Sequence, residues 1–209
     1  MLTNYDNVVF DLGGVILDIN RDKCVEALEA LGFSEADKML DLYVQTGIFL
    51  ALEDGSASAA EFYDELRKQC TKPGVSDADI SEALSRFITG LPVARLQALR
   101  ELRAQGKRIF SLSNTNPVMY PTRIAELFRA EGLQIDDYFD GQILSFREQV
   151  CKPAPGIFQR LLTRYKLDPA RTLFLDDSAK NCEAAEEQGI VSVLIPEGAE
   201  FMDILSFVD

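Results

Sequence analysis

Histidine is absent from the 209 residues of this chain. That absence excludes Ser-His-Asp and Cys-His catalysis, histidine-containing zinc sites and haem held by a proximal histidine. Acid–base chemistry must therefore come from carboxylates, lysine, tyrosine, cysteine or a metal-bound water.

Paired cysteines and long apolar runs are also missing. The four cysteines are far apart and form no Cys-x-x-Cys pair, so we expect free thiols in a reducing compartment. The sequence does not open with a basic segment and a long apolar stretch, and no apolar run approaches the ~20 residues of a membrane span. These absences predict a cytoplasmic protein with no signal peptide and no membrane partner.

Basic residues are scarce, since 21 lysines and arginines face 34 acidic residues and the net charge is −13. Nucleic acids and anionic membranes are bound through basic patches, so neither is an expected partner. A small anionic substrate is compatible with this charge, because a divalent cation held by carboxylates could bind it. With 47% hydrophobic residues, the chain fits one large domain or a core with a modest insertion, as a monomer or a small homo-oligomer.

Short apolar segments alternate with helical patterns along most of the chain. The predicted strands are 7–10, 108–113, 172–177 and 191–195, with a weaker candidate at 141–145. The predicted helices between them are 93–105, 158–165 and 179–188. This alternation predicts an α/β fold, a doubly wound parallel sheet with helices on both faces.

Residues 18–90 interrupt the alternation, because they show helical patterns and no strand pattern. Three helix-start signals occur there, namely Ser34-x-x-Asp37, Ser58-x-x-Glu61 and Ser76-x-x-Asp79. We therefore expect a helical cap at 18–90, inserted after the first strand of a Rossmann-like core formed by 1–17 and 91–209.

Polar residues stand at or directly after the ends of three predicted strands, at the edge where parallel sheets bind ligands. Asp11 precedes two glycines and is suited to act as a nucleophile or a metal ligand, although a turn aspartate would look the same. Asp176 and Asp177 are adjacent carboxylates that repel each other unless a cation such as Mg²⁺ lies between them, and one of them could instead cap the next helix.

Two further segments offer groups that suit a phosphoryl oxygen. Ser113 and Asn114 provide a hydroxyl, an amide and backbone donors, but the sequence after them is also typical of a turn. Lys152, which precedes a proline, is a candidate phosphate-binding charge, although a lone lysine is more often a surface residue.

In their order along the chain, these segments resemble the four motifs of the haloacid dehalogenase (HAD) superfamily of hydrolases. The matching segments are Phe10-Asp11-Leu12-Gly13-Gly14-Val15, Leu112-Ser113-Asn114, Lys152-Pro153 and Phe174-Leu175-Asp176-Asp177. The resemblance spans nearly the whole chain. It implies a HAD-type Rossmannoid core with a small helical cap, a small phosphorylated substrate and Mg²⁺ as cofactor.

The same resemblance implies roles for individual residues. Asp11 would be the nucleophile that takes the phosphoryl group as an aspartyl-phosphate. It would also bind Mg²⁺ together with the Gly13 carbonyl and Asp177, and Asp176 would support that site.

The other two motifs would bind the transferred group. Ser113, Asn114 through its backbone, and Lys152 would hold the phosphoryl oxygens. A carboxylate that attacks a dianion needs this charge neutralised, which Mg²⁺ and a lysine together supply.

One position departs from the usual phosphatase pattern, because Gly13 stands where a second aspartate protonates the leaving group. Loss of general acid–base help typically costs ~10²–10⁴-fold in rate. The closest resemblance is to the α-glucose-1-phosphate phosphatase branch, which also has glycine there. Asp18 is a candidate substitute, but a polar residue leading into the cap is the simpler interpretation.

Four functions stay open at this point. We favour a phosphatase for a small phosphorylated metabolite such as a sugar phosphate. The alternatives are a phosphate-binding protein with little or no turnover, a 2-haloacid dehalogenase, and a phosphonate hydrolase that uses a cap lysine, for which Lys23, Lys38, Lys68 and Lys72 are available. The cap aromatics are expected to pack between helices rather than contact substrate; they are Tyr43, Phe49, Phe62, Tyr63 and Phe87.

Overall fold

A five-stranded sheet in which all neighbours are parallel forms the centre of the molecule. The computed structural model describes residues 2–42 and 45–207. The strands are β1 (Asn7–Phe10), β4 (Arg108–Ser113), β5 (Gly141–Leu144), β6 (Thr172–Asp176) and β7 (Val191–Leu194), in the spatial order β5-β4-β1-β6-β7. All five predicted strands are present, and the doubly wound α/β fold is confirmed.

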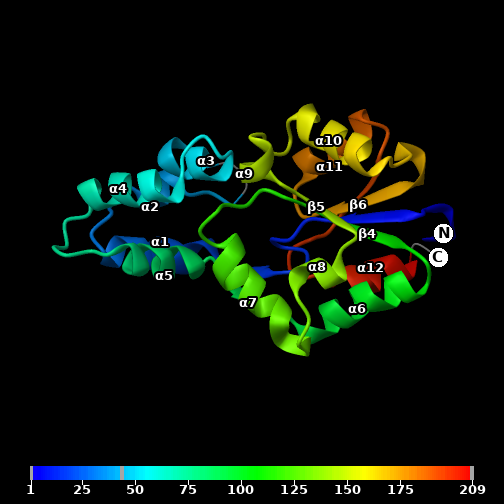
Figure 1. Ribbon diagram of the computed structural model, residues 1–209, viewed down its shortest axis with the longest axis horizontal. Helices are drawn as coiled ribbons and strands as arrows, with labels where there is room; N and C mark the ends of the chain where they lie inside the picture. Colours follow the sequence, from blue (N-terminus) through cyan, green and yellow to red (C-terminus); the bar gives the residue numbers. More distant parts are fainter. Residues whose placement is uncertain (1, 43–44, 208–209) are drawn as a thin grey trace.

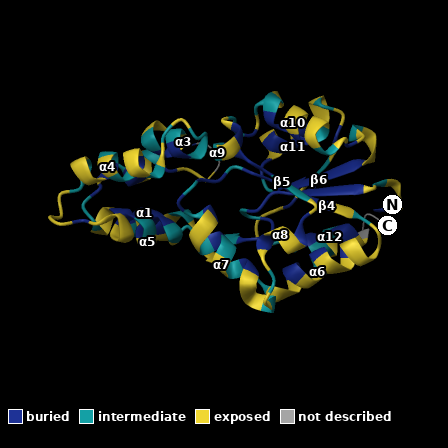
Figure 2. Cartoon of the chain, viewed as in Figure 1, coloured by how far each residue is buried: buried dark blue, intermediate teal, exposed yellow. Residues whose placement is uncertain are grey.

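Helices cover both faces of this sheet (Figure 1). On one face lie α6 (Val93–Ala104), α8 (Ile135–Tyr138) and α12 (Phe201–Phe207), and on the other lie α10 (Pro155–Tyr165) and α11 (Ala179–Glu187). Successive side chains of β1 pack against opposite faces of the sheet, since Val8 and Phe10 belong to one hydrophobic cluster and Val9 to another. The central strands are buried on both faces (Figure 2). Their sequences are therefore continuous apolar runs rather than alternating patterns.

Shorter helical segments connect these elements. They are η1 (Leu2–Asn4), the π-helix η2 (Tyr120–Ile124), α7 (Ala125–Leu127), η3 (Phe128–Glu131), α9 (Ser145–Glu148) and η4 (Pro169–Arg171). The helix predicted from residue 158 begins three residues earlier, because Pro155 occupies its first turn, where its missing N–H costs no hydrogen bond.

Five helices lie together at the end of the molecule away from the described chain ends (Figure 1). They are α1 (Arg21–Ala30), α2 (Ala36–Met39), α3 (Gly47–Glu53), α4 (Ala59–Gln69) and α5 (Asp77–Ser85), and we call them the helical cap. The cap has a hydrophobic cluster of its own, in which the ring of Phe49 contacts those of Phe33 and Phe62.

The three helix-start signals of the cap behave differently. Ser58 and Ser76 both form complete capping boxes, with Glu61 and Asp79 respectively. Ser34 does not cap a helix, because α2 begins after Glu35 and has no side-chain cap. The prediction at Ser34 is therefore wrong.

The expectation that 18–90 contains no strand is also wrong. A short antiparallel ribbon, β2 (Asp18–Ile19) with β3 (Ile88–Gly90), forms where the chain leaves the core for the cap and where it returns. Two or three residues are too few to show a periodic pattern. Arg95 on α6 anchors this region, because its guanidinium donates to Asp18 at 2.8 Å and to Glu200 at 2.9 Å.

The four cysteines are free thiols, as expected. Within the described ranges, no helix has both the length and the apolar character needed to cross a membrane.

Candidate active site

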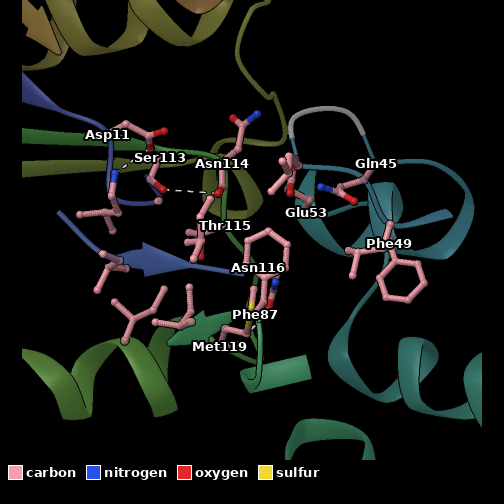
Figure 3. Close-up of a pocket in the computed structure, with 18 of the residues that line it drawn as sticks. Asp11, Gln45, Phe49, Glu53, Phe87, Ser113, Asn114, Thr115, Asn116 and Met119 are labelled. Atoms are coloured by element: carbon pink, nitrogen blue, oxygen red, sulfur yellow. Dashed lines mark hydrogen bonds between the residues drawn. The ribbon is translucent and has the colours of Figure 1, made fainter. Parts of the chain in front are cut away.

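The carboxyl ends of β1, β4 and β6 lie side by side, and β1 is the point from which the chain winds outwards in both directions. A pocket opens at this edge. The core lines it with residues that the sequence singled out, namely Asp11, Gly13, Ser113, Asn114, Lys152 and Asp177. The cap and the loop after β4 supply the facing wall, with Gln45, Phe49, Glu53, Thr115 and Asn116 among its residues (Figure 3).

Asp11 directly follows β1, and the backbone holds it in place. Its N–H donates to the Leu175 carbonyl at 2.9 Å, and its Oδ1 accepts from the Leu12 N–H at 2.7 Å. Burial raises the pKa of Asp11 to about 7, with further contributions from the charges of Asp176 and Asp177, against the lowering effect of Lys152. Without a metal ion, the buried carboxylate is thus costly to ionise even beside Lys152.

Lys152 is a buried cation between two of these acids. Its Nζ lies 2.9 Å from Asp11 Oδ1 and 2.7 Å from Asp176 Oδ2. Burial alone would lower the pKa of Lys152, but the charges of Asp11 and Asp176 outweigh it, and the pKa lies above its ordinary value. The ammonium group therefore stays charged throughout the neutral range.

The side chain of Asn114 holds Lys152 from behind. Its amide nitrogen donates to the Lys152 carbonyl at 3.0 Å, and its Oδ1 accepts from the Lys152 N–H at 2.8 Å. The amide is thus engaged in positioning the lysine. Ser113 is buried beside it, and its hydroxyl makes a long 3.4 Å hydrogen bond to the Asn114 carbonyl.

The two aspartates after β6 have different surroundings. Asp176 is fully buried, and its oxygens accept from Lys152, from the Ser178 N–H at 2.9 Å and from the Asn181 amide at 2.9 Å. Asp176 therefore positions Lys152 and has little capacity left for a cation. Asp177 lines the pocket, and burial followed by the charge of Asp176 raises its pKa to about 6.

Oxygens of Asp11, Asp176 and Asp177 lie within 4.8 Å of one another. The hard carboxylate oxygens of Asp11 and Asp177 suit Mg²⁺, whose charge would offset the burial and the repulsion that raise the pKa values of these two acids.

The two glycines after Asp11 differ in what they permit. At Gly14, whose φ is +71°, a Cβ would lie 2.1 Å from Asp177 Oδ2, so only glycine fits. At Gly13, a Cβ would meet Ile19 Cγ2 at an ordinary 3.6 Å, and no positive φ stands in the way. The loop therefore has room for a Cβ at position 13, and sterics do not require glycine there.

The family model for haloacid dehalogenase-like hydrolases matches residues 5–189. The chain belongs to this family.

Among HAD-like relatives, the D-ribitol-5-phosphate phosphatase of Bacteroides thetaiotaomicron is 36% identical over 202 residues, which cover 97% of both chains. The sesquiterpene phosphatase astK of Aspergillus oryzae is 28% identical over 196 residues, covering 92% of this chain and 91% of that one. A HAD family enzyme of B. thetaiotaomicron, solved in complex with magnesium and inorganic phosphate, superimposes with a TM-score of 0.89 at 32% identity. The match covers 96% of this chain and 98% of that one.

Several pocket residues of this HAD-like chain were not anticipated. Thr115 and Asn116 directly follow the second motif, so extending that motif by two residues would have found them. Gln45, which precedes α3, and Glu53, which ends it, come from the cap, where no local pattern distinguishes them from other polar residues. Only the tertiary fold brings them to the strand ends.

Other candidates lie away from the pocket. Asp18 is paired with Arg95 and lines an adjoining cavity instead. The four cap lysines are exposed, and none lines the pocket in the described part of the chain. Phe62 and Tyr63 pack within the cap, whereas Phe49 and Phe87 also line the pocket; Tyr43 lies outside the described residues.

Proposed function

We propose that the protein is a Mg²⁺-dependent phosphatase for a small phosphorylated metabolite, such as a sugar or sugar-alcohol phosphate. The observation that carries this proposal is the buried Lys152 ammonium 2.9 Å from Asp11, in a pocket that also presents Asp177 and Ser113. A charged lysine beside the acid suits a nucleophile that must approach a phosphoryl dianion. The relationship to a phosphatase at 36% identity supports the same reaction.

The chain's own residues divide the work as follows. The Asp11 carboxylate attacks phosphorus to form an aspartyl-phosphate, and Lys152 and the Ser113 hydroxyl bind the phosphoryl oxygens. Asn114 and Asp176 hold Lys152 in position. Bound Mg²⁺, held by Asp11, Asp177 and the Gly13 carbonyl, would neutralise negative charge on the phosphoryl group.

The alternatives have less support from the pocket. Among the described residues, no arginine lines it, whereas a haloacid dehalogenase normally places an arginine in its cap. Since no cap lysine lines it either, a phosphonate hydrolase with a lysine Schiff base is disfavoured. An activity assay distinguishes an enzyme from a binding protein without turnover.

The test is phosphate release from a panel of hexose 1-phosphates, pentitol 5-phosphates and p-nitrophenyl phosphate, with Mg²⁺ or with EDTA. We expect release that depends on Mg²⁺. Metal-independent halide release from 2-chloropropionate, borohydride trapping of a cap lysine, or saturable binding without turnover would each overturn the proposal in favour of one alternative.

We further propose the cellular setting and organisation. Residues 18–90 would act as a cap that closes over a core of 1–17 and 91–209. The protein would be cytoplasmic, as a monomer or a small homo-oligomer, which the free thiols and the acidic surface support.

Magnesium should stabilise the protein more at high pH than at low pH. The raised pKa values of Asp11 (about 7) and Asp177 (about 6) mean that the folded state holds protons which the unfolded chain loses near pH 4. The stability of the metal-free protein therefore falls as pH rises from about 4 to about 7. Mg²⁺ replaces those protons and, near 100-fold above its dissociation constant, should add about 2.7 kcal/mol.

Thermal melts with Mg²⁺ and with EDTA, at about pH 5 and about pH 8, measure this effect. We expect a Tm gain of roughly 5–10 °C at the higher pH and a small one at the lower. The Asp177→Asn variant should lose most of the gain. Equal gains at both pH values would contradict the assignment of these carboxylates to the metal.

A further inference from the structure

The pocket of this hydrolase lacks a side-chain acid at position 13, and the structure offers one elsewhere. Three carboxylic acids line the pocket among the described residues, namely Asp11, Glu53 and Asp177. Asp11 is needed as the nucleophile and Asp177 as a metal ligand. Glu53 is the acid that these roles leave free.

Glu53 comes from the opposite side of the pocket to the nucleophile. It is the last residue of α3, and Figure 3 shows it on the cap side, facing the strand ends that bear Asp11, Ser113 and Asn114. Its backbone carbonyl is 2.7 Å from Ser145 Oγ, which also lies 2.9 Å from the Thr115 carbonyl. This hydroxyl connects the end of α3 to the core and holds Glu53 at the pocket.

We propose that Glu53 is the general acid and base of this hydrolase, supplied by the cap in place of the side chain that position 13 lacks. The proposal rests on the phosphatase function proposed above. An acid on the cap side stands opposite Asp11, which is where the leaving oxygen of an in-line displacement lies.

The proton balance of the reaction closes with this one residue. As the Asp11 oxygen–phosphorus bond forms and the ester phosphorus–oxygen bond breaks, the leaving oxygen keeps the electron pair and takes the Glu53 proton, releasing the alcohol. The Glu53 carboxylate then accepts a proton from the water that attacks the aspartyl-phosphate. Inorganic phosphate leaves, and Asp11 and the protonated Glu53 are restored.

The surroundings of Glu53 favour the protonated form that the first step needs. Burial raises the pKa of Glu53 to about 8, and the charges of Asp11 and Asp54 act in the same direction. Lys152 and a hydrogen bond with the Cys151 side chain oppose the rise. At neutral pH, Glu53 therefore carries a proton to donate, unlike an ordinary glutamic acid.

The test compares two leaving groups in the Glu53→Gln variant of the full-length protein. An alkyl ester, such as a pentitol 5-phosphate, needs its leaving oxygen protonated, whereas p-nitrophenolate leaves without help. We expect the initial phosphorylation by the alkyl ester to slow by about 10²–10⁴-fold. With p-nitrophenyl phosphate, we expect a burst of p-nitrophenol equal to the enzyme concentration, followed by slow turnover as phosphorylated Asp11 accumulates.

Two further variants control the experiment. Glu65→Gln makes the same chemical change at the cap surface, where Glu65 contacts Lys68 and Gln69, and it should behave as wild type. Gly13→Asp places an acid where the loop has room, so it should restore alkyl-ester hydrolysis at least tenfold in the Glu53→Gln background.

The outcomes separate this proposal from the phosphatase proposal. If the folded Glu53→Gln variant loses the same factor on both esters with no burst, or loses nothing on either, Glu53 is not the general acid. If the wild-type protein releases phosphate from neither ester with Mg²⁺, the proposed function itself fails. Folding of each variant is checked by its thermal melt and by Mg²⁺ stabilisation.

Discussion

The Asp11→Asn variant is expected to lose turnover by about 10⁴-fold or more, while its metal-free form becomes more stable than wild type. The amide cannot attack phosphorus, and the neighbouring Asp176 cannot take over, since it is occupied by Lys152 and Asn181. Asp177 is assigned to the metal, and Glu53 lies on the opposite side of the pocket. The stability gain follows from the raised pKa of Asp11, because a carboxylate that resists ionisation is a liability to the folded state.

Urea unfolding in EDTA at about pH 8 should show a gain of roughly 1–2 kcal/mol for Asp11→Asn. The gain should shrink as pH falls towards 4 and vanish below it, where the wild-type acid is protonated in both states. Phosphate release is measured on the same preparations with Mg²⁺. Activity of the Asp11→Asn variant above about one per cent of wild type would contradict the assignment of Asp11 as the nucleophile. Lower stability in EDTA would mean that its contact with Lys152 outweighs the cost of burying its charge.

Replacing Lys152 with methionine is expected to damage both catalysis and folding. The variant removes the cation that faces Asp11 and Asp176, and it leaves two buried acids without a partner of opposite charge. Removing one partner of a buried ion pair typically costs 3–5 kcal/mol, which for a chain of this size lowers Tm by roughly 10 °C. Activity should fall by at least about 10²-fold, because the charge that receives the phosphoryl group is gone.

Lys180→Met is the matched control, since this lysine is exposed on the neighbouring helix α11. It should change stability by less than about 0.5 kcal/mol and leave activity intact. The deficit of Lys152→Met should shrink towards acid pH, as Asp11 takes up a proton and no longer needs a counter-charge. A Lys152→Met protein as stable as wild type at neutral pH would show that the three charges do not depend on one another.

The parallel sheet was readable from sequence because its central strands are buried on both faces. Val8, Val9 and Phe10 form an unbroken apolar run, and the strand ends where Asp11 follows. The ribbon of β2 and β3 was not readable, because two or three residues show no period and their pairing joins distant parts of the chain. Ser34 looked like a helix start, yet α2 begins two residues later, since a local signal competes with packing of the cap.

The candidate site also contains residues that the sequence predicts and residues that it does not. Asp11, Asp177 and Lys152 each stand in a recognisable motif, and the topology of a parallel sheet alone predicts that strand ends meet. Glu53 and Gln45 belong to no motif, and their approach to the pocket depends on how five cap helices pack over the core. The hydrogen-bond partners of side chains could not be predicted either. The Asn114 amide bonds to the Lys152 backbone, and this pairing depends on the tertiary fold.

The ribbon of β2 and β3 brings the two ends of the cap insertion together. Asp18 and Gly90 are paired, so the chain departs from the core and rejoins it at neighbouring points. Because the entropy of closing a loop grows only slowly with its length, a different insertion between these two residues would disturb the sheet little. Such an exchange would retain Asp11 and Lys152 but discard Glu53. The cap would then carry both the recognition and the protonation of the leaving group, while the core would keep the residues that bind the phosphoryl group.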